Sequence, residues 1–417
     1  MRRLVVALSF LVLLNLVACD LGFAQSKTSA GWPQFLGPDR NGISAEKNLI
    51  DAWPKAGLKE VWRVPGGVGM AAVVVDGSIA VTMIQNPKQT VVALDPKTGK
   101  TKWSQEIAPN YRNAMGNGPR ATPAIHNGVV YAFSGEGILA ALSAKTGKVM
   151  WSANLVARHK GRSAEYGMAS SPLVYGKVVV VTVGAPNATV VAVNQSDGET
   201  AWTAGTGDPA GYSSPAILKI GKTNQLVAFS GSAALGVDPS NGKQLWKHRY
   251  PTPYDCNIVT PQLINGNVFI SSGENHGSTM LGVSGSGAVK KLWESTGRTS
   301  VMRNEWQTAI HLNGHLFGYD NVGGAGPITH LTCIDAKTGA RKWQQARFGK
   351  GNMIAADGKF FGTTMKGEVV VLEANAEEFV ELGRMEVMGA TRQAPSLANG
   401  LLYIRDDREI ICLDVRK

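Results

Sequence analysis

Cysteine is scarce in this chain: there are four in 417 residues, and no two are adjacent or separated by only two residues. The absence of a CxxC pair or a Cys/His cluster argues against a metal or redox centre, so no metal site is predicted. Cys333 and Cys412 fall at the same position of two distant repeats, so we expect buried free thiols too far apart for a disulfide. Cys256 is also expected to be free.

The sequence also lacks the glycine-rich loops of several enzyme classes. It has no G-x-S-x-G segment, the nucleophile elbow of the α/β-hydrolases. The Gly-Lys-Thr triplets at residues 99–101 and 221–223 resemble the end of a phosphate-binding loop. Neither triplet is preceded by the first glycine that such a loop needs, so no phosphate site is predicted.

Charged residues make up 18% of the chain, and the formal net charge is +11. Many lysines fall in predicted hairpin turns, namely Lys97, Lys100, Lys145, Lys148, Lys243 and Lys337. No aromatic residues interleave with basic ones in a stripe that could stack bases, so nucleic acid is not an expected partner. We interpret the turn lysines as a solvated ring that favours solubility, with attraction to anionic lipid or envelope polymers as the alternative.

Tryptophan, in contrast, recurs at nearly even intervals. The successive gaps are 41, 48, 51, 44, 47 and 50 residues, and the series comprises Trp62, Trp103, Trp151, Trp202, Trp246, Trp293 and Trp343. A period of this size indicates a repeat architecture. Most members follow an apolar run, a turn and a glycine, as in ALDPKTGKTKW and CIDAKTGARKW.

Each repeat carries signals for about four short strands. The apolar run is typical of a strand, Asp95 and Gly99 form the turn in the first repeat, and the next strand carries the tryptophan. Between tryptophans, a Thr-Pro, Ser-Pro or Ala-Pro pair and a glycine four to six residues later delimit two more strands.

The repeat count indicates a closed ring. The third-strand signature occurs eight times, around Leu94, Leu142, Val193, Val237, Val283, Ile334, Leu372 and Leu413. Repeat seven has Leu382 in place of a tryptophan, and repeat eight ends at Lys417 without a fourth strand. Leu58–Val64 has the pattern of a fourth strand that no third strand precedes. We predict that it completes the last repeat of an all-β, eight-bladed β-propeller of four-stranded antiparallel blades. A solenoid, the alternative, would not need complementary half-repeats at its two ends.

The pattern A-x-D-x-x-T-G-x-x-x-W at Ala93–Trp103 resembles the tryptophan-docking motif of pyrroloquinoline-quinone (PQQ) type propellers, and the resemblance covers roughly residues 58–417. Trp32–Gly42 is similar to the lead-in of such propellers, whereas the signatures of WD40 repeats are absent. The resemblance implies that each tryptophan packs between neighbouring blades. The family includes quinoprotein dehydrogenases and a non-catalytic lipoprotein of outer-membrane β-barrel assembly, so the fold does not decide the activity.

The first residues have the pattern of an export signal, with two arginines before the apolar run Leu4–Val17. A segment like a bacterial lipobox ends at Cys19, which is the predicted lipidation site; cleavage after Ala24 to release a soluble protein is the alternative. We expect residues 1–19 to be the signal peptide, residues 20–57 a tether and lead-in, and residues 58–417 the propeller. The expected location is the periplasm or outer membrane of a Gram-negative-type bacterium.

The loops that enter the first strand of each blade are predicted to face the propeller axis. They contribute Arg120, Tyr166, Tyr212, Asn257, Glu305, Trp306, Gln307, Asn352 and Arg392. These residues either plug the funnel, bind a ligand or peptide, or hold a quinone. The polar loop Gly273–Gly277 is expected to be an exposed turn.

The resemblance implies what a quinone site would require. Quinoprotein dehydrogenases hold PQQ near the axis beside Ca²⁺, which takes carboxylate and amide oxygens, with an aspartate as general base. Glu305 and Asn257 are the candidate ligands, but one carboxylate among two arginines is a poor calcium site. The chain also lacks the adjacent cysteine pair of many such enzymes.

We therefore expect a lipid-anchored, monomeric, non-catalytic scaffold without a cofactor, which binds protein or peptide partners in the cell envelope. Recognition is expected through the loops of one face, helped by β-augmentation at a blade edge. The alternative is a PQQ- and calcium-dependent oxidoreductase. A carbohydrate-binding module is a weaker third interpretation, because no exposed aromatic ladder is evident.

Overall fold

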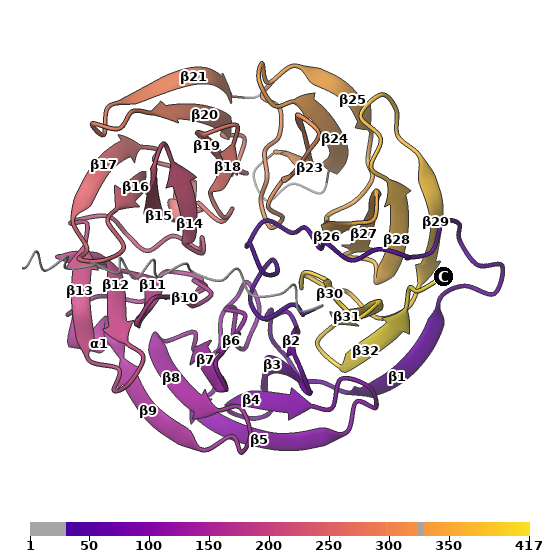
Figure 1. The fold of residues 1–417 in the computed structure, drawn as a ribbon, viewed down its shortest axis with the longest axis horizontal. Coiled ribbons are helices and arrows are strands. Elements are labelled where there is room, and N and C mark those ends of the chain that lie inside the picture. The colour runs from indigo at the N-terminus through magenta and orange to yellow at the C-terminus, as the bar shows by residue number, and fades with distance from the viewer. Residues whose placement is uncertain (1–30, 298, 324–327) are drawn as a thin grey trace, which may run out of the picture.

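The computed structural model describes residues 31–297, 299–323 and 328–417, which form eight four-stranded antiparallel sheets in a ring (Figure 1). The predicted eight-bladed propeller is therefore confirmed. Helix in these residues is limited to α1 (Leu155–Arg158) and a 3-10 turn, η1 (Pro253–Asp255). Neither has the length and apolar character of a membrane span. The predicted signal peptide and Cys19 lie outside the described residues.

Blades one to four follow one another along the chain, each with its innermost strand first. Blade one consists of β2 (Val74–Asp76), β3 (Ile79–Gln85), β4 (Gln89–Leu94) and β5 (Thr101–Ala108). Blade two consists of β6 (Ala124–His126), β7 (Val129–Phe133), β8 (Ile138–Ser143) and β9 (Val149–Asn154). Blade three consists of β10 (Leu173–Tyr175), β11 (Val178–Ala185), β12 (Ala188–Asn194) and β13 (Thr200–Ala204). Blade four consists of β14 (Ala216–Ile220), β15 (Thr223–Phe229), β16 (Ala233–Val237) and β17 (Gln244–Arg249).

Blades five to seven continue in the same order. Blade five consists of β18 (Gln262–Ile264), β19 (Asn267–Ser272), β20 (Gly277–Val283) and β21 (Val289–Thr296). Blade six consists of β22 (Ile310–Leu312), β23 (His315–Val322), β24 (Ile328–Asp335) and β25 (Arg341–Gln345). Blade seven consists of β26 (Gly351–Ala356), β27 (Lys359–Thr364), β28 (Glu368–Glu373) and β29 (Glu381–Glu386).

Blade eight joins the two ends of the propeller. It contains β30 (Ser396–Ala398), β31 (Leu401–Arg405), β32 (Glu409–Asp414) and, as its outer strand, β1 (Lys59–Pro65). In the antiparallel pairing of β1 with β32, Lys59 faces Asp414 and Pro65 faces Glu409. The predicted closure by the segment at residues 58–64 is therefore confirmed.

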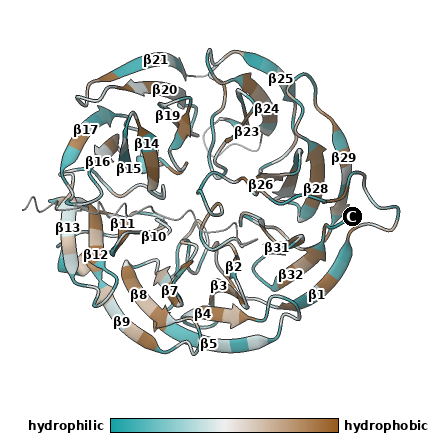
Figure 2. Cartoon of the chain, in the orientation of Figure 1, coloured by the Kyte–Doolittle hydropathy of each residue, from teal (hydrophilic) through white to brown (hydrophobic). Residues whose placement is uncertain are grey.

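Within each blade, burial decreases from the inner strands to the outer one. Every residue of β4 is buried, whereas β5 alternates between exposed and half-buried positions. Figure 2 shows the same contrast, with β8 and β28 hydrophobic and most of β5 hydrophilic. The middle strands have sheets packed on both faces, so they read as continuous apolar runs, whereas an outer strand meets water on one face.

Tryptophans join most of the blades to the next one. Gly147, in the last turn of blade two, has φ +74°, and a Cβ there would lie 2.6 Å from the ring of Trp103 in blade one. The same ring-on-glycine contact joins Trp62 to Gly99, Trp151 to Gly198, Trp202 to Gly242 and Trp293 to Gly339. The indole N–H of Trp103 also donates to the Ala144 carbonyl at 2.9 Å. Equivalent bonds run from Trp62 to Pro96, Trp151 to Gln195, Trp293 to Ala336 and Trp343 to Asn375. The docking role implied by the resemblance therefore matches the geometry.

Two tryptophans depart from this pattern. Trp246 donates its N–H to the side chain of Gln225 in its own blade, at 2.7 Å. In blade five, β20 and β21 pair as far as Val283 and Val289, which leaves a shorter turn, and Gly287 there approaches the backbone of Leu245 instead of the indole ring. Trp202 packs like the others, but its buried Nε1 has no hydrogen-bond acceptor among the described residues.

Blade seven has no docking tryptophan of its own. Strand pairing places Gly383 opposite Val371, as Trp103 lies opposite Ala93 in blade one. The assignment of Leu382 to this position was wrong by one residue, because the turn between β28 and β29 is longer than that of blade one. Trp53, from the lead-in, covers the glycine: a Cβ on Gly383 would lie 2.2 Å from its indole.

The two faces of the ring differ in the turns that form them. In each blade, the turn between the first two strands lies beside the turn between the last two; in blade two, for example, the Ala144 N–H donates to the Gly128 carbonyl at 2.8 Å. We call the face with these turns the lower face. The loops that enter each first strand lie on the opposite, upper face.

Residues 32–57, which we call the strap, cross the lower face and block the axis (Figure 1). Trp32 pairs with Val75 of blade one, and on the far side of the ring Ile43 pairs with Ala355 of blade seven. Between them, the buried Arg40 donates to the carbonyls of Ser171 and Pro172 in blade three, both at 2.9 Å. Burial lowers the pKa of Arg40 to about 9. The strap then follows blades seven and eight outward and leads into β1.

Replacing Trp151 and Trp202 by phenylalanine tests the indole hydrogen bond. Both are 9% exposed, but Trp151 donates to the Gln195 carbonyl at 2.8 Å and Trp202 has no acceptor. Trp151→Phe should lower the free energy of unfolding by about 1 kcal/mol more than Trp202→Phe, because it leaves a carbonyl without its donor. Urea unfolding measures both. Equal losses would mean that ring packing alone joins the blades.

Gly383→Ala tests whether the strap covers the gap in blade seven. The added methyl group would displace the indole of Trp53, so we expect a loss of about 1–3 kcal/mol in the free energy of unfolding and a change in tryptophan fluorescence. The matched control is Gly285→Ala, where a Cβ meets nothing within 4 Å and the change should stay within about 0.5 kcal/mol. An unaltered Gly383→Ala protein would contradict the packing of Trp53 at this position.

Candidate functional site

A cavity of about 510 Å³ opens at the upper end of the propeller axis. Its wall comes from the loops that enter the first strands of several blades and from the turn between β19 and β20. Its lining includes Phe35 of the strap, which blocks the axis from below. The strap therefore forms the floor of the cavity, and the upper loops form its walls.

Most of the residues predicted to face the axis line this cavity. They are Arg120, Tyr166, Tyr212, Glu305, Trp306, Asn352 and Arg392. Asn257 and Gln307 lie behind the wall. The fully buried Asn257 amide donates to the carbonyls of Ser230 and Tyr250, and the Gln307 Oε1 accepts the Tyr319 N–H at 3.2 Å. These two side chains hold the loops in place and do not reach the cavity.

Arg120 braces one side of the wall. Its guanidinium donates to the carbonyls of Gly116, Gly118 and Tyr166, and it lies 4.5 Å from the centroid of the Tyr111 ring. All three guanidinium nitrogens are thus used within the protein, and burial lowers the pKa of Arg120. Beside it, the rings of Tyr166 and Tyr212 stack with their centroids 5.6 Å apart.

The other side of the wall is a cluster of cations around Trp306. Lys350 Nζ lies 4.6 Å from the centroid of the indole, and the guanidinium carbon of Arg392 lies 5.2 Å from it. Lys350 also forms a 2.8 Å ion pair with Glu305. Burial raises the pKa of Glu305, and the bond from Lys350 opposes this shift.

Arg392 keeps donors for a ligand. Its Nη1 donates to the Met115 carbonyl, and its own carbonyl accepts from the Asn352 amide at 3.0 Å. Within the described residues, Nε and Nη2 make no further bond. Arg392 is therefore the cation of this cluster best placed to meet an anionic group in the cavity.

The mouth of the cavity is apolar and was not predicted. Met115 and Tyr254 line it and are 39% and 62% exposed, which is unusual for side chains of their size. Tyr254 has a left-handed backbone, with φ 57°, as does the neighbouring Asp255, with φ 54°. These residues lie in non-repeating loops, so the repeat pattern carried no signal for them.

The loop at residues 273–277 differs from its prediction as an exposed turn. Glu274 is half-buried and lines the axial cavity. The loop joins β19 to β20 on the upper face and points toward the axis, where the entry loops of other blades cover it. The glycines and polar residues of this loop suggested exposure to solvent, but the position of the turn in the fold decides how exposed it is.

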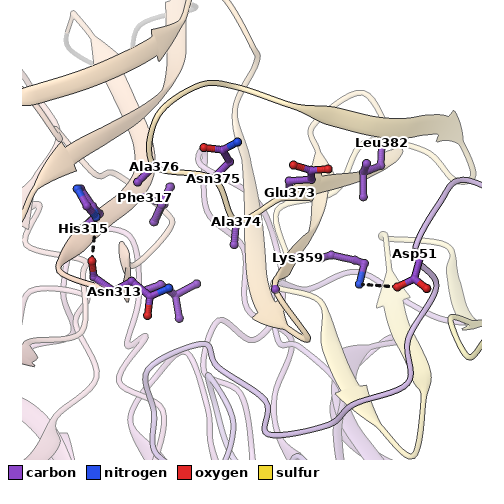
Figure 3. A pocket seen from close by; sticks show the side chains of 12 residues that line it. Asp51, Asn313, His315, Phe317, Lys359, Glu373, Ala374, Asn375, Ala376 and Leu382 are labelled. Carbon is purple, nitrogen blue, oxygen red and sulfur yellow. Dashed lines mark hydrogen bonds and ion pairs between the residues drawn. The ribbon is translucent and has the colours of Figure 1, made fainter.

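A second cavity, of about 570 Å³, opens on the lower face between blades six and seven (Figure 3). Figure 3 shows Lys359 turned toward Asp51 of the strap, at 3.5 Å, and His315 toward the Asn313 carbonyl, at 2.9 Å. These polar groups pair at separate ends of the groove and do not converge on one point. The axial cavity is therefore the candidate functional site.

The fold and the axial cavity define the class of the protein: it is a PQQ-like β-propeller. The chain belongs to the family described as outer membrane protein assembly factor BamB, whose model matches residues 44–166 and 87–345 and so spans more than half of the chain. No curated protein sequence matches it.

Several solved structures share the fold at low sequence identity. BamB from Moraxella catarrhalis is 14% identical, with 86% of this chain and 99% of that chain covered and a TM-score of 0.58. Quinohemoprotein alcohol dehydrogenase from Comamonas testosteroni is 15% identical, with 93% and 81% covered and a TM-score of 0.67. A europium-containing methanol dehydrogenase is 14% identical, with 89% and 88% covered and a TM-score of 0.66. At such identity these likenesses establish the fold alone.

The axial cavity does not fit a quinone held beside calcium. Calcium needs six to eight oxygen ligands, but Glu305 already binds Lys350 and Asn257 is buried behind the wall. Within the described residues, no three His, Cys, Asp or Glu side chains are grouped to hold a metal ion. Cys256 lines the cavity as a free thiol without a neighbouring cysteine. We therefore derive no chemical step from such a cofactor.

The thiols give a test of burial at the site. The described cysteines are free and buried, as predicted, and burial raises the pKa of Cys256, Cys333 and Cys412 to about 12. Thiols react as thiolates, so at pH 8 all three should resist iodoacetamide in the folded protein and react fully in guanidinium chloride. Peptide mass spectrometry resolves each site. Rapid labelling of Cys256 under native conditions would mean that the cavity wall opens.

Proposed function

We propose that the chain is an exported, non-catalytic scaffold of the cell envelope that binds a segment of a protein partner in its axial cavity. The observation that carries this proposal is the composition of the cavity: exposed apolar side chains at the mouth, aromatic walls, and charged groups engaged mainly with the protein itself. Such a site is suited to recognition, because apolar and aromatic walls with a few placed polar groups bury and orient a bound segment.

The charged residues support binding over chemistry. A general base must be able to reach a substrate proton, but Glu305 is committed to Lys350. Arg120 is committed to backbone carbonyls. Arg392 alone among the cavity arginines keeps two donor nitrogens, so the favoured partner segment carries an acidic side chain beside apolar ones.

The apolar mouth supports a protein partner. Large exposed side chains that rim a concave site mark interaction surfaces, and aromatic anchors near the centre of an interface carry most of its energy. The left-handed backbone at Tyr254 disfavours this residue type, and such strain is common at binding sites. Tyr254 is thus the expected anchor.

The envelope location is part of the proposal. It is supported by the signal-like N-terminal residues and by the family description, which names outer membrane protein assembly. Lipidation at Cys19 and a monomeric state complete it. A quinone-dependent oxidoreductase is the alternative that the fold of the solved dehydrogenases suggests.

The test replaces the mouth residues. Tyr254→Ser with Met115→Ser should weaken capture of the envelope partner by about 30-fold, the effect of losing one strong hot spot. The matched control is Leu292→Ser with Val61→Ser, which removes apolar side chains of similar exposure, 48% and 37%, from outer strands. Partners are identified by cross-linking and mass spectrometry in envelope extracts, and affinities are then measured with the purified pair.

Two outcomes would contradict the proposal. Equal binding by both double variants would place the interface elsewhere on the propeller. Quinone absorbance together with alcohol oxidation, after addition of PQQ and Ca²⁺ to the purified protein, would establish the oxidoreductase instead.

A further inference from the structure

The lower face carries an arc of lysines over blades one to four. Its members, which we call the lysine arc, are Lys97, Lys100, Lys145, Lys148, Lys177 and Lys222, and all are exposed. They sit in turns of four consecutive blades, so they cover one half of the lower face. Of the turn lysines that the sequence suggested as a ring, Lys97, Lys100, Lys145 and Lys148 belong to this arc. Lys243 lies in the last turn of blade four, in the same half, and Lys337 lies in blade six, in the other half.

The lysine arc is not neutralised by its neighbours. Within the described residues, none of its six ammonium groups lies within ion-pair distance of a carboxylate. The nearby Asp95 and Asp197 instead accept hydrogen bonds from the backbone of their own turns. On the other half of the lower face, some cations are paired, as in Lys342 with Glu377 and Lys417 with Asp51, whereas the exposed Lys337 of blade six pairs with no described carboxylate.

The path of the chain adds an independent observation. The described chain begins on the lower face, where the Trp32 N–H donates to Val75 of blade one at 2.8 Å and the Pro33 carbonyl accepts from Ile125 of blade two. Whatever precedes Trp32 therefore joins the protein beside the lysine arc. Met150 of β9, close to Lys148, is 55% exposed and adds an apolar side chain to the same region.

We propose that the lysine arc docks the lower face of blades one to four on the surface of an anionic lipid bilayer. Unpaired lysines near an anionic leaflet gain from its negative surface potential, and an apolar side chain beside them can enter the headgroup region. The proposal goes beyond the partner site, since it concerns the opposite face. It leaves the axial cavity open toward the aqueous compartment.

The test uses the chain from Gln25 onward, so that neither the apolar run Leu4–Val17 nor a lipid anchor at Cys19 contributes to binding. Flotation with vesicles containing phosphatidylglycerol should recover this protein, whereas vesicles of phosphatidylcholine alone should not. Added salt should release it, because charges at a surface are screened within about 8 Å at physiological ionic strength. Changing Lys97, Lys100, Lys145 and Lys148 to glutamine should weaken vesicle binding by at least about tenfold.

A matched variant separates the lysine arc from net charge. Glutamine at Lys88, Lys160, Arg162 and Lys366 removes the same charge from exposed positions on the upper face. This variant should keep its affinity within about twofold, because its charges face away from the bilayer. Thermal unfolding of both variants establishes that they are folded.

Three results would overturn the proposal: no preference for phosphatidylglycerol, equal losses in the two variants, or tighter capture of a soluble polyanion such as heparin than of the vesicles. Failure here would leave the partner site unaffected, because partner capture is measured separately with the variants of the cavity mouth. If partner capture were lost while vesicle binding stayed normal, the proposed membrane role of the lysine arc would be unaffected.

Discussion

The contact between an indole and the last turn of the next blade is the interaction on which the rest of the structure depends. Trp103 shows it in full, with its ring on Gly147 and its N–H on the Ala144 carbonyl. A blade buries its inner strands only if its neighbours cover both faces, so each such contact makes one sheet the support of the next. Because the ring is closed, every blade has a neighbour on both sides. Blade seven lacks its own tryptophan, and Trp53 from outside the repeats covers Gly383 there.

Closure creates a problem at the axis, because the inner strands contact their neighbours around the ring, as β2 contacts β6 and β30, and surround the centre without filling it. The strap meets it from below, where both Nη atoms of the buried Arg40 donate to carbonyls of blade three, while its Nε has no partner among the described residues. An unsatisfied guanidinium in such a place would be costly, because burial disfavours its charged form. What remains above the strap is a cavity whose walls are loops that the ring itself does not constrain.

The difference between the repeated blades and the unconstrained loops explains which features the sequence could predict. The blades, the closing strand at residues 58–64 and the buried thiols follow from comparing each repeat with its copies, so they were recognised. Phe35, Met115 and Tyr254 have no copies, and their place in the cavity depends on how separate loops meet in space. Asn257 and Gln307 were correctly placed on the entry loops, but a sequence does not tell which side of a loop a side chain occupies. The error at Leu382 arose in the same way, from a turn whose length departs from the repeat.

The contrast between repeated blades and non-repeating loops also separates fold from activity in β-propellers. Blade number, turn glycines and docking tryptophans are set by packing, so a likeness to alcohol dehydrogenases over most of the chain establishes the fold alone. The candidate site lies among the upper loops, where Lys350 pairs with Glu305 and backbone carbonyls accept hydrogen bonds from Arg120. The turns of the lower face are constrained differently, since the docking of the blades already fixes their backbone. Their exposed side chains can therefore vary in charge at little structural cost, which is the condition under which a lysine-rich surface can arise on one half of a ring.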